Sequence, residues 1–431
     1  MPEPTKGAHG PLLVVEPELG GHQFDHVAYL LRHWPLEALA RTRFLVHPDF
    51  LSAHGHELAD LVGFDAEHFR AATSDDLSRW HEPRAALRSF GRWAVARRHA
   101  EAVGARHVHF QHLDHLQLPL ALRRIAGVGV SGVLFQPTVH YGRIGPSPSA
   151  TETLKSVRKA ILYRLMLRNS ALGTVFTLDP LFIKHARGWQ GASKLVYLPD
   201  PAPQLADASD ARPEPGRADR VRFLLFGALA RRKGIHQTAR ALRHVAPDLA
   251  DKVAVVFAGA LAGEDRADFM RAVDIARAER PSLDIRVDDR RLPEAELERL
   301  IAGSDVILMP YQRFAGSSGV LLWAAAAGKP VLAQDYGLVG ELVRAHRLGW
   351  AVDTTRPEEI GRAMERIVSG WPENGSTGEG AADFLSGRTT RSFACTLFQR
   401  LAPALGLPPD LECRTEDPKP EGRPADPGAI R

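Results

Sequence analysis

The amino-acid sequence predicts an α/β protein with two doubly wound, Rossmann-like domains. Short strand-like runs alternate with helix-like segments along most of the chain, a rhythm that favours parallel sheets covered by helices. The length of 431 residues exceeds what one hydrophobic core usually supports. Residues 199–219 (PDPAPQLADASDARPEPGRAD) have no apolar period and are typical of a linker. We therefore expect an N-terminal domain over residues 1–198 and a second domain over residues 220–368.

The N-terminal half begins with a unit of strand, loop and helix. Residues Leu12 to Val15 form a buried-strand run, and apolar residues recur at helical spacing from His22 to Trp34. Further strands are predicted at Phe44 to Val46, Val108 to Phe110, Val133 to Phe135, Val175 to Thr177 and Leu195 to Leu198.

The second half repeats this rhythm, with a helix predicted after nearly every strand. Its strands are predicted at Arg222 to Phe226, Val253 to Ala258, Leu283 to Val287, Val306 to Met309 and Val331 to Ala333. Residues 381–405 are predicted to be helical. The charged, Pro-rich residues 408–431 are expected to be disordered.

Composition excludes several classes of protein. With 44% apolar and 25% charged residues, the chain is not expected to be disordered as a whole. The net charge is +4 and the pI is near 9.1, but Asp and Glu are distributed nearly throughout, so no nucleic-acid footprint is evident. The two cysteines, Cys395 and Cys413, suit a reducing, cytoplasmic compartment. Leu12 to Val15 is too short for a signal sequence or a membrane span.

A candidate phosphate site follows the first strand of the second domain. In FGALARRKGI, residues 226–235, a strand end leads into a glycine turn, three cations and a helix start. Gly227 allows close approach of a ligand, Arg231, Arg232 and Lys233 supply charge, and the helix offers unpaired N–H groups. The alternative is a solvated basic loop.

A second candidate lies between Pro310 and Pro330. The strand there leads into Gly316, Ser317, Ser318 and Gly319, and an Ala-rich helix follows. The serines can cap the helix and donate hydroxyl groups, and Gly319 permits close approach of a diphosphate. The alternative is that a serine is only an N-cap.

Taken in order, four segments resemble a known family: FGALARRKGI, VVFAGA, SDVILMPY and GSSGVLLWAAAAGKPVLAQDYGLVGELV. They resemble the C-terminal domain of the GT-B retaining glycosyltransferases, the superfamily that contains glycogen and sucrose synthases. The resemblance covers roughly residues 222–368, with a weaker echo in residues 14–31. It implies a GT-B fold, with two Rossmann-like domains that face each other across a cleft.

The resemblance also implies an activity. The expected reaction moves a sugar from a nucleoside-diphosphate sugar to an acceptor, with retention, in polysaccharide or glycoconjugate biosynthesis. No metal and no cofactor beyond the donor co-substrate are expected. The acceptor is unknown, and a lipid-linked one is among the candidates.

Site residues follow from the resemblance position by position. The lysine that binds the donor diphosphate corresponds to Lys233. In the family an arginine commonly follows the first glycine, whereas this chain has Ala228 there. Arg231 or Arg232 could compensate for the absent arginine. The family's two glutamates, spaced eight apart, correspond to Ala315 and Trp323. Their replacement keeps open a non-catalytic relative that binds a sugar nucleotide or a partner, and a GT-B nucleotide-sugar epimerase is a third alternative.

Glu341 has two interpretations. It could help to hold the nucleotide, or it could be a first-turn helix carboxylate that the helix dipole favours.

In the N-terminal half, His140 is the first catalytic candidate. It follows a predicted strand, where retaining family members commonly have a histidine near the transferred sugar; the alternative is a structural histidine. Gly20, Gly21 and His22 could form an acceptor or phosphate loop, or only a turn. A cluster of potential metal ligands also occurs in this half of the sequence. Because a strand sends alternate side chains to opposite faces, these ligands are not expected to converge, and no metal site is predicted. The cluster comprises His109, His112, Asp114 and His115.

Residues Leu154 to Asn169 are predicted to form a basic amphipathic helix. Leu, Val, Ile and Met alternate there with Lys and Arg. Such a helix could lie on an anionic membrane, which would place the protein at the inner membrane face, or it could dock on the N-terminal sheet with its cations in solvent.

Overall fold

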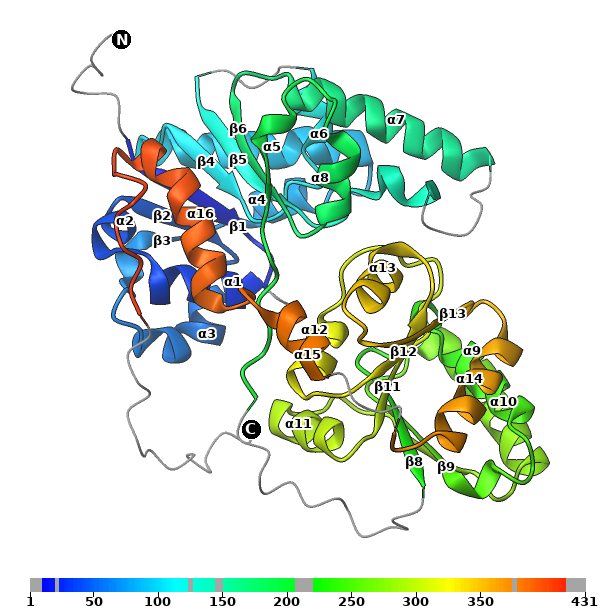
Figure 1. The fold of residues 1–431 in the computed structure, drawn as a ribbon. Coiled ribbons are helices and arrows are strands. Elements are labelled where there is room, and N and C mark those ends of the chain that lie inside the picture. Colours follow the sequence, from blue (N-terminus) through cyan, green and yellow to red (C-terminus); the bar gives the residue numbers. More distant parts are fainter. Residues whose placement is uncertain are drawn as a thin grey trace.

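The chain forms two parallel β-sheets, each covered by helices (Figure 1). The computed structural model describes residues 10–19, 23–122, 127–143, 150–205, 220–373 and 378–415. The first sheet has strand order β3-β2-β1-β4-β5-β6-β7 and the second has order β10-β9-β8-β11-β12-β13. Both orders are doubly wound, as the sequence predicts, because the chain moves outward from a central strand in one direction and then in the other.

The N-terminal sheet consists of β1 (Leu12–Glu16), β2 (Thr42–Val46), β3 (Phe69–Ala71), β4 (His107–Phe110), β5 (Gly129–Leu134), β6 (Leu172–Thr177) and β7 (Leu195–Tyr197). Its helices are α1 (Gln23–His33), α2 (Leu36–Ala40), α3 (Phe50–Ala59), α4 (Ser74–Trp80), α5 (Ala85–Val103), α6 (Gln117–Ala121), α7 (Ala150–Leu167) and α8 (Pro180–Ala186). A 3-10 turn, η2, spans Thr138–Arg143.

The C-terminal sheet consists of β8 (Val221–Phe226), β9 (Val253–Ala258), β10 (Asp284–Asp288), β11 (Val306–Met309), β12 (Val331–Gln334) and β13 (Gly349–Val352). Its helices are α9 (Ile235–Ala241), α10 (Gly263–Glu279), α11 (Glu294–Ala302), α12 (Gly319–Ala326), α13 (Gly337–Ala345) and α14 (Pro357–Ser369). Two further helices, α15 (Gly378–Leu385) and α16 (Thr390–Leu405), follow.

Burial on both faces of each sheet explains why the strands are readable from the sequence. Apolar clusters lie on the two sides of each sheet, so all five residues of β1 are buried and read as a continuous run. Every predicted strand overlaps an observed one. The sequence does not reveal β3 and β13, because both are short strands at a sheet edge with partly exposed residues.

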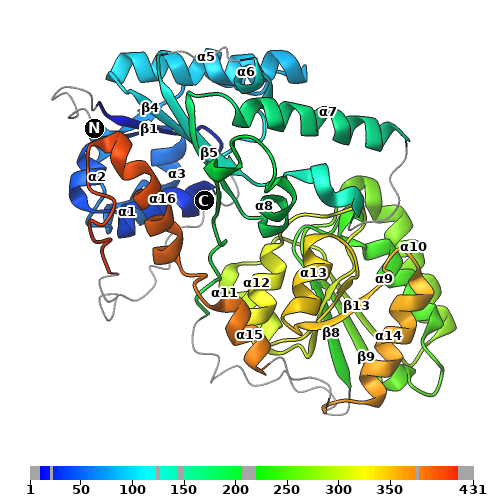
Figure 2. The same ribbon diagram turned by 45° about the horizontal axis from the view of Figure 1, so that its top comes forward.

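The helical segment predicted over residues 381–405 is divided into α15 and α16 by a break at residues 386–389. Gly387 has φ of +73°, a backbone conformation that ends α15, and Thr389 starts α16 by accepting a hydrogen bond from the Ser392 N–H (3.0 Å). After this break, α16 returns to the N-terminal domain and lies beside α1 (Figure 2). The Trp34 indole N–H donates to the Ala394 carbonyl (2.8 Å), and α16 contributes Leu397 to the same apolar cluster as α1.

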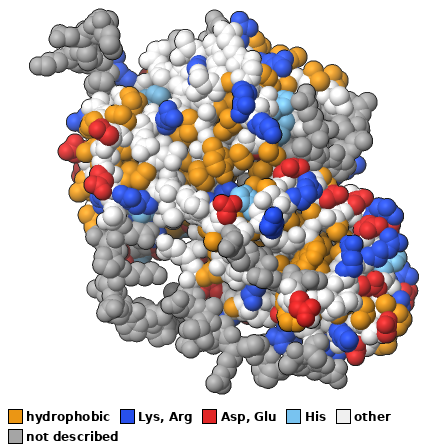
Figure 3. Space-filling model, in the orientation of Figure 1, with side chains coloured by type: hydrophobic (Ala, Val, Ile, Leu, Met, Phe, Trp, Pro, Cys, Tyr) orange, Lys and Arg blue, Asp and Glu red, His pale blue; other side chains and the backbone are white. Residues whose placement is uncertain are grey.

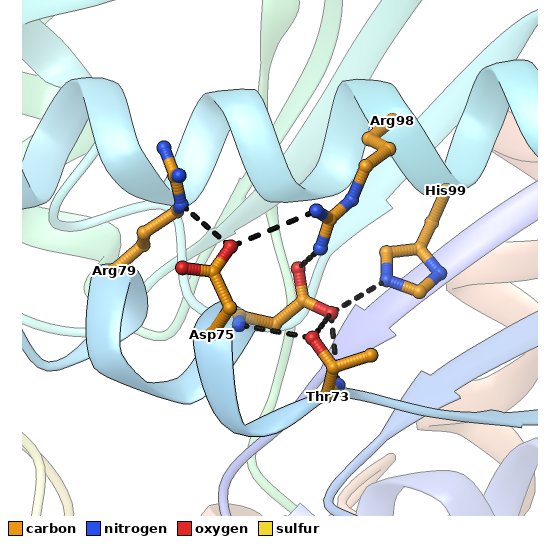
Figure 4. Close-up of polar contacts among 6 residues, drawn as sticks. Thr73, Asp75, Arg79, Arg98 and His99 are labelled. Atoms are coloured by element: carbon orange, nitrogen blue, oxygen red, sulfur yellow. Dashed lines mark hydrogen bonds and ion pairs between the residues drawn. The ribbon is translucent and has the colours of Figure 1, made fainter.

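A buried carboxylate joins α4 to α5. Asp76 accepts hydrogen bonds from the backbone and hydroxyl of Thr73, which itself caps α4, and pairs with Arg98 and His99 of α5. Figure 4 shows Thr73, Arg98 and His99 converging between the two helices. Burial alone would raise the pKa of Asp76, but hydrogen bonds from Thr73 and His99 lower it to about 2.

Candidate functional site

Two loops meet at the carboxyl ends of the central strands β8 and β11. The first connects β8 to α9 and the second connects β11 to α12. Gly234 has φ of +76°, and a Cβ atom there would lie 1.9 Å from the Pro310 carbonyl oxygen. Only glycine therefore allows this approach of the two loops.

A chain of polar groups joins the loops. The Lys233 ammonium donates to the Tyr311 hydroxyl (3.2 Å), which is hydrogen bonded to the Ser318 hydroxyl (2.8 Å). Burial lowers the pKa of Lys233 to about 8, and the charge of Arg232 contributes to this shift. Burial raises the pKa of Tyr311 to about 12, so its hydroxyl stays protonated. A partly desolvated cation that lacks a carboxylate partner among the described residues is suited to an anionic ligand.

Arg232 adds a second cation next to Lys233. Its guanidinium lies 5.1 Å from the centre of the Phe314 ring, and its carbonyl accepts from the Gln312 N–H (2.8 Å). Arg232 itself is exposed. The cation–π contact holds the guanidinium over the second loop.

The start of α12 completes this cluster. Ser318 precedes the helix, but its hydroxyl bonds to Tyr311, and within the described residues no side chain caps α12. Ser318 thus occupies the N-cap position, but its side chain bonds to Tyr311 instead of capping the helix. No described heavy atom lies within 4 Å of the position a Cβ would take on Gly319. The backbone at the start of α12 is therefore uncrowded, and the Ser318 hydroxyl next to it is linked through Tyr311 to Lys233.

Arg231 lies on the other side of this loop. Its backbone N–H donates to Asp265 (2.7 Å) and its guanidinium pairs with the same carboxylate (3.2 Å). His236 also contacts Asp265 (3.2 Å). Arg231 thus anchors the loop on α10, whereas Arg232 and Lys233 reach the second loop.

The N-terminal domain approaches the second loop through Gln136. A Cβ on Gly316 would lie 3.9 Å from Gln136 Cγ. The segment around Gln136 is fixed by Asp114, whose carboxylate accepts from the N–H groups of Phe135 (2.8 Å) and Gln136 (3.0 Å). The Lys159 ammonium donates to the Gln136 carbonyl (2.9 Å).

Residues 208–383 match the family model of the glycosyl transferases group 1. The C-terminal domain belongs to this family. No curated protein sequence matches the chain significantly. The matched region contains both loops of the cation cluster, so the group 1 domain carries the site described above.

Comparison with solved structures shows that the whole chain has the GT-B fold. Sucrose-phosphate synthase from Thermosynechococcus elongatus is similar with a TM-score of 0.64 and 15% identity, over 90% of this chain and 98% of that chain. HepE from Anabaena, in complex with UDP, has a TM-score of 0.61 and 14% identity, over 91% and 100%. The UDP-forming alpha,alpha-trehalose-phosphate synthase from Burkholderia vietnamiensis has a TM-score of 0.59 and 15% identity, over 92% and 100%.

Two positions distinguish this GT-B chain from the pattern it resembles. Trp323, in place of a glutamate, is partly buried and packs against the apolar cluster around α12. Ala315 contacts the start of α13, where its carbonyl accepts from the Leu338 N–H (2.9 Å). Apolar residues thus occupy both positions, and Trp323 packs in the core around α12.

Glu341 lies on α13 of the group 1 domain. The interpretation of Glu341 as a first-turn carboxylate is wrong, because α13 begins at Gly337 and Glu341 is its fifth residue. Its carboxylate pairs with Arg344 (2.6 Å).

His140 is buried in the N-terminal domain of the GT-B chain. Its Nε2 lies 3.0 Å from Asp179, and both side chains are almost fully buried. The Asp179 carboxylate also caps α8 by accepting from the N–H groups of Leu181 (2.9 Å) and Phe182 (3.2 Å). His140 therefore connects η2 to α8, whereas Gln136 lies next to Gly316 of the C-terminal domain.

The histidines near β4 have separate partners. His109 bonds to Ser131 (2.9 Å), and His112 bonds to the buried Glu16 at the end of β1 (3.3 Å). Burial raises the pKa of Glu16. Burial opposes protonation of His112, but the bond to Glu16 prevails and raises its pKa. Among the described residues, no group of three or more His, Cys, Asp or Glu could hold a metal ion. Gly20, Gly21 and His22 lie outside the described residues.

Sequence reasoning missed Tyr311, Gln136 and Asp265. The sequence carries a signal for Tyr311 and for Gln136, each of which follows a predicted strand. Gln136 and Asp265 gain their positions from contacts between segments that are far apart in the chain.

Proposed function

We propose that this protein transfers a sugar from a nucleoside-diphosphate sugar to an acceptor. The observation that carries the proposal is the chain from Lys233 through Tyr311 to Ser318 at the uncapped start of α12. It combines a partly desolvated cation with a helix start that no described side chain caps, and both features are suited to a diphosphate. HepE, which shares the fold, was crystallised with UDP.

In the proposed reaction the bond between the anomeric carbon and the diphosphate oxygen breaks. The diphosphate keeps the electron pair, and the acceptor hydroxyl forms the new bond and releases its proton. Lys233, Arg232 and the N–H groups of α12 would stabilise the negative charge that grows on the leaving diphosphate. This electrostatic catalysis uses the chain's own groups and requires no metal. Retention of configuration is supported by the family resemblance.

The N-terminal domain is proposed to bind the acceptor. Gln136 lies next to Gly316, and the imidazole of His112 is stacked on Phe135 (4.2 Å between ring centroids). These side chains offer hydrogen-bonding groups and an aromatic face, which suit a hydroxyl-bearing acceptor. Through its pair with Asp179, His140 would position this loop. A cytoplasmic role in polysaccharide or glycoconjugate assembly is part of the proposal.

The second candidate function is a non-catalytic subunit that binds a sugar nucleotide. The apolar residues Ala315 and Trp323, at positions where carboxylates are usual in the family, favour it. Such a protein would bind the donor without turning it over.

Calorimetric titration with nucleoside diphosphates and their sugars tests the donor site. We expect one selective ligand, and Lys233→Ala to weaken its binding by at least about tenfold, because a charge-assisted contact contributes about 1.5–3 kcal/mol. Lys252→Ala is the matched control, because Lys252 is exposed just before β9, at the amino end of the parallel strands and away from the two loops.

The outcomes separate the alternatives. Binding that Lys233→Ala leaves unchanged would remove the assignment of the diphosphate site. Selective binding with release of nucleoside diphosphate in the presence of acceptors would establish the transferase. Selective binding without any turnover would favour the non-catalytic subunit.

A further inference from the structure

The long helix α7 exposes a continuous apolar stripe. Its four members are spaced by three or four residues and therefore share one face of the helix. Their exposed fractions range from 39% to 72%: Leu154 72%, Val157 52%, Ile161 51% and Leu165 39%. Large apolar side chains exposed in a row indicate a contact surface, whereas single ones are ordinary.

The opposite face of α7 packs against the N-terminal domain. Tyr163 and Met166 are fully buried in the N-terminal core, and Lys159 donates to Gln136 and to the Thr138 hydroxyl (3.1 Å). Docking of α7 on its own domain therefore explains its inner face and leaves the stripe uncovered by described residues.

Basic residues border the stripe on both sides. Lys155 and Arg158 lie along one side, and Arg164 and Arg168 lie along the other, all exposed. None of the four forms an ion pair with a described carboxylate. In Figure 3, orange and blue side chains lie together at the upper right of the molecule, where α7 lies in Figure 1.

We propose that α7 binds the surface of an anionic phospholipid bilayer. The stripe would enter the boundary between headgroups and acyl chains, and the flanking cations would contact lipid phosphates. A second copy of the chain is a poorer occupant, because pairing two such helices would bring the basic rows together. None of the described helices is long and apolar enough to cross a membrane.

The position of α7 connects this surface to the candidate site. Through Lys159, its inner face holds the segment whose Gln136 lies next to Gly316. A bilayer under α7 would thus be close to the acceptor side of the molecule. This step rests on the proposed function, and it implies that the acceptor is attached to a lipid.

Sedimentation with phospholipid vesicles tests the proposal on the full chain. Vesicles of phosphatidylcholine alone are compared with vesicles that contain phosphatidylglycerol, at low and at high salt. We expect binding to the anionic vesicles only, weakened by salt because exposed charges are screened. The double variant Leu154→Ser/Ile161→Ser should lose at least about tenfold in vesicle affinity, since two large apolar side chains leave the interface. Lys155→Glu/Arg158→Glu should abolish the preference for anionic lipid.

Val62→Ser/Ile275→Ser is the matched control, because Val62 (65% exposed) and Ile275 (40%) lie outside α7. It should bind vesicles like the wild type. Equal binding by Leu154→Ser/Ile161→Ser and the wild type would overturn the proposal, as would the absence of wild-type binding at low salt. A dimer that dissociates in Leu154→Ser/Ile161→Ser would assign the stripe to a second copy instead. Nucleotide titration of the same variants should be unchanged, so a failure of the donor site is detected separately.

Discussion

At the scale of single residues, the site depends on a lysine placed where its charge is costly. Lys233 is held between the two loops by the Tyr311 hydroxyl, 4.9 Å from the centre of the Tyr311 ring. Burial lowers the pKa of its ammonium group, and an anionic ligand would stabilise the charged form. Charged side chains at functional sites are often buried in this way, at a cost in folding stability.

The titration of Lys233 predicts a pH dependence of donor binding. In the free protein its pKa is lowered to about 8. A bound diphosphate favours the charged form and raises this pKa, so binding takes up a proton as the pH rises through 8. Affinity should be constant below this pH and fall above it, approaching about tenfold per pH unit. Calorimetry in buffers of different ionisation enthalpy measures the proton uptake.

Lys233→Arg provides the control for this titration. Arginine stays protonated throughout the accessible range, so its affinity should not depend on pH in the same window. An unchanged pH profile in Lys233→Arg would assign the titration to another group.

The contact between His140 and Asp179 predicts that His140, a candidate catalytic residue, stabilises the fold. His140→Ala leaves the buried Asp179 carboxylate without this partner, which should destabilise the protein by about 3–5 kcal/mol. Denaturant unfolding measures the loss, and calorimetry should give unchanged nucleoside-diphosphate affinity. Unchanged stability with a large loss of turnover would instead indicate that His140 contacts the substrate.

At the scale of elements, short helices are fixed by buried polar contacts. The helix α4 has seven residues, which is too short to be stable alone, and Asp76 connects it to α5. The sequence does contain a cap signal, Thr73 followed three residues later by Asp76. The partners Arg98 and His99 come from a helix that the spacing of the cap residues cannot reveal.

Asp76→Ala should therefore destabilise the N-terminal domain by about 3 kcal/mol, because it removes a cap and leaves buried partners unsatisfied. The pKa of Asp76 is lowered to about 2, so its stabilising contribution is complete above the unfolded pKa of about 4 and lost as the pH falls through 2. Thermal unfolding at neutral pH measures the change. Asp75→Ala, at an exposed neighbour, should stay within about 0.5 kcal/mol of the wild type.

At the scale of the whole molecule, the end of the chain belongs to the first domain. The helix α16 lies in the same apolar cluster as α1, although more than 350 residues separate Trp34 from Ala394. The two segments that cross between the domains also contact each other: Arg388 donates to the Tyr197 hydroxyl (2.8 Å), and its carbonyl accepts from the Ala202 N–H (2.8 Å).

Leu397→Ala tests this arrangement. Leu397 is fully buried, so its truncation should cost about 2–5 kcal/mol and increase hydrogen exchange in β1 of the N-terminal domain. Gln399→Ala, an exposed neighbour on α16, should change neither. Faster exchange confined to the C-terminal sheet would contradict the packing of α16 on the first domain.

The sequence by itself determined the features that depend on local order along the chain. Strand runs are legible because both sheet faces are buried, and Gly234 and Lys233 stand out because a tight turn and a cation adjoin a strand end. Tertiary structure decided which groups meet. It directs Arg231 to Asp265, buries His140 against Asp179, breaks the final helix and returns α16 to the first core. These outcomes depend on contacts between segments far apart in the chain, which residue spacing does not encode.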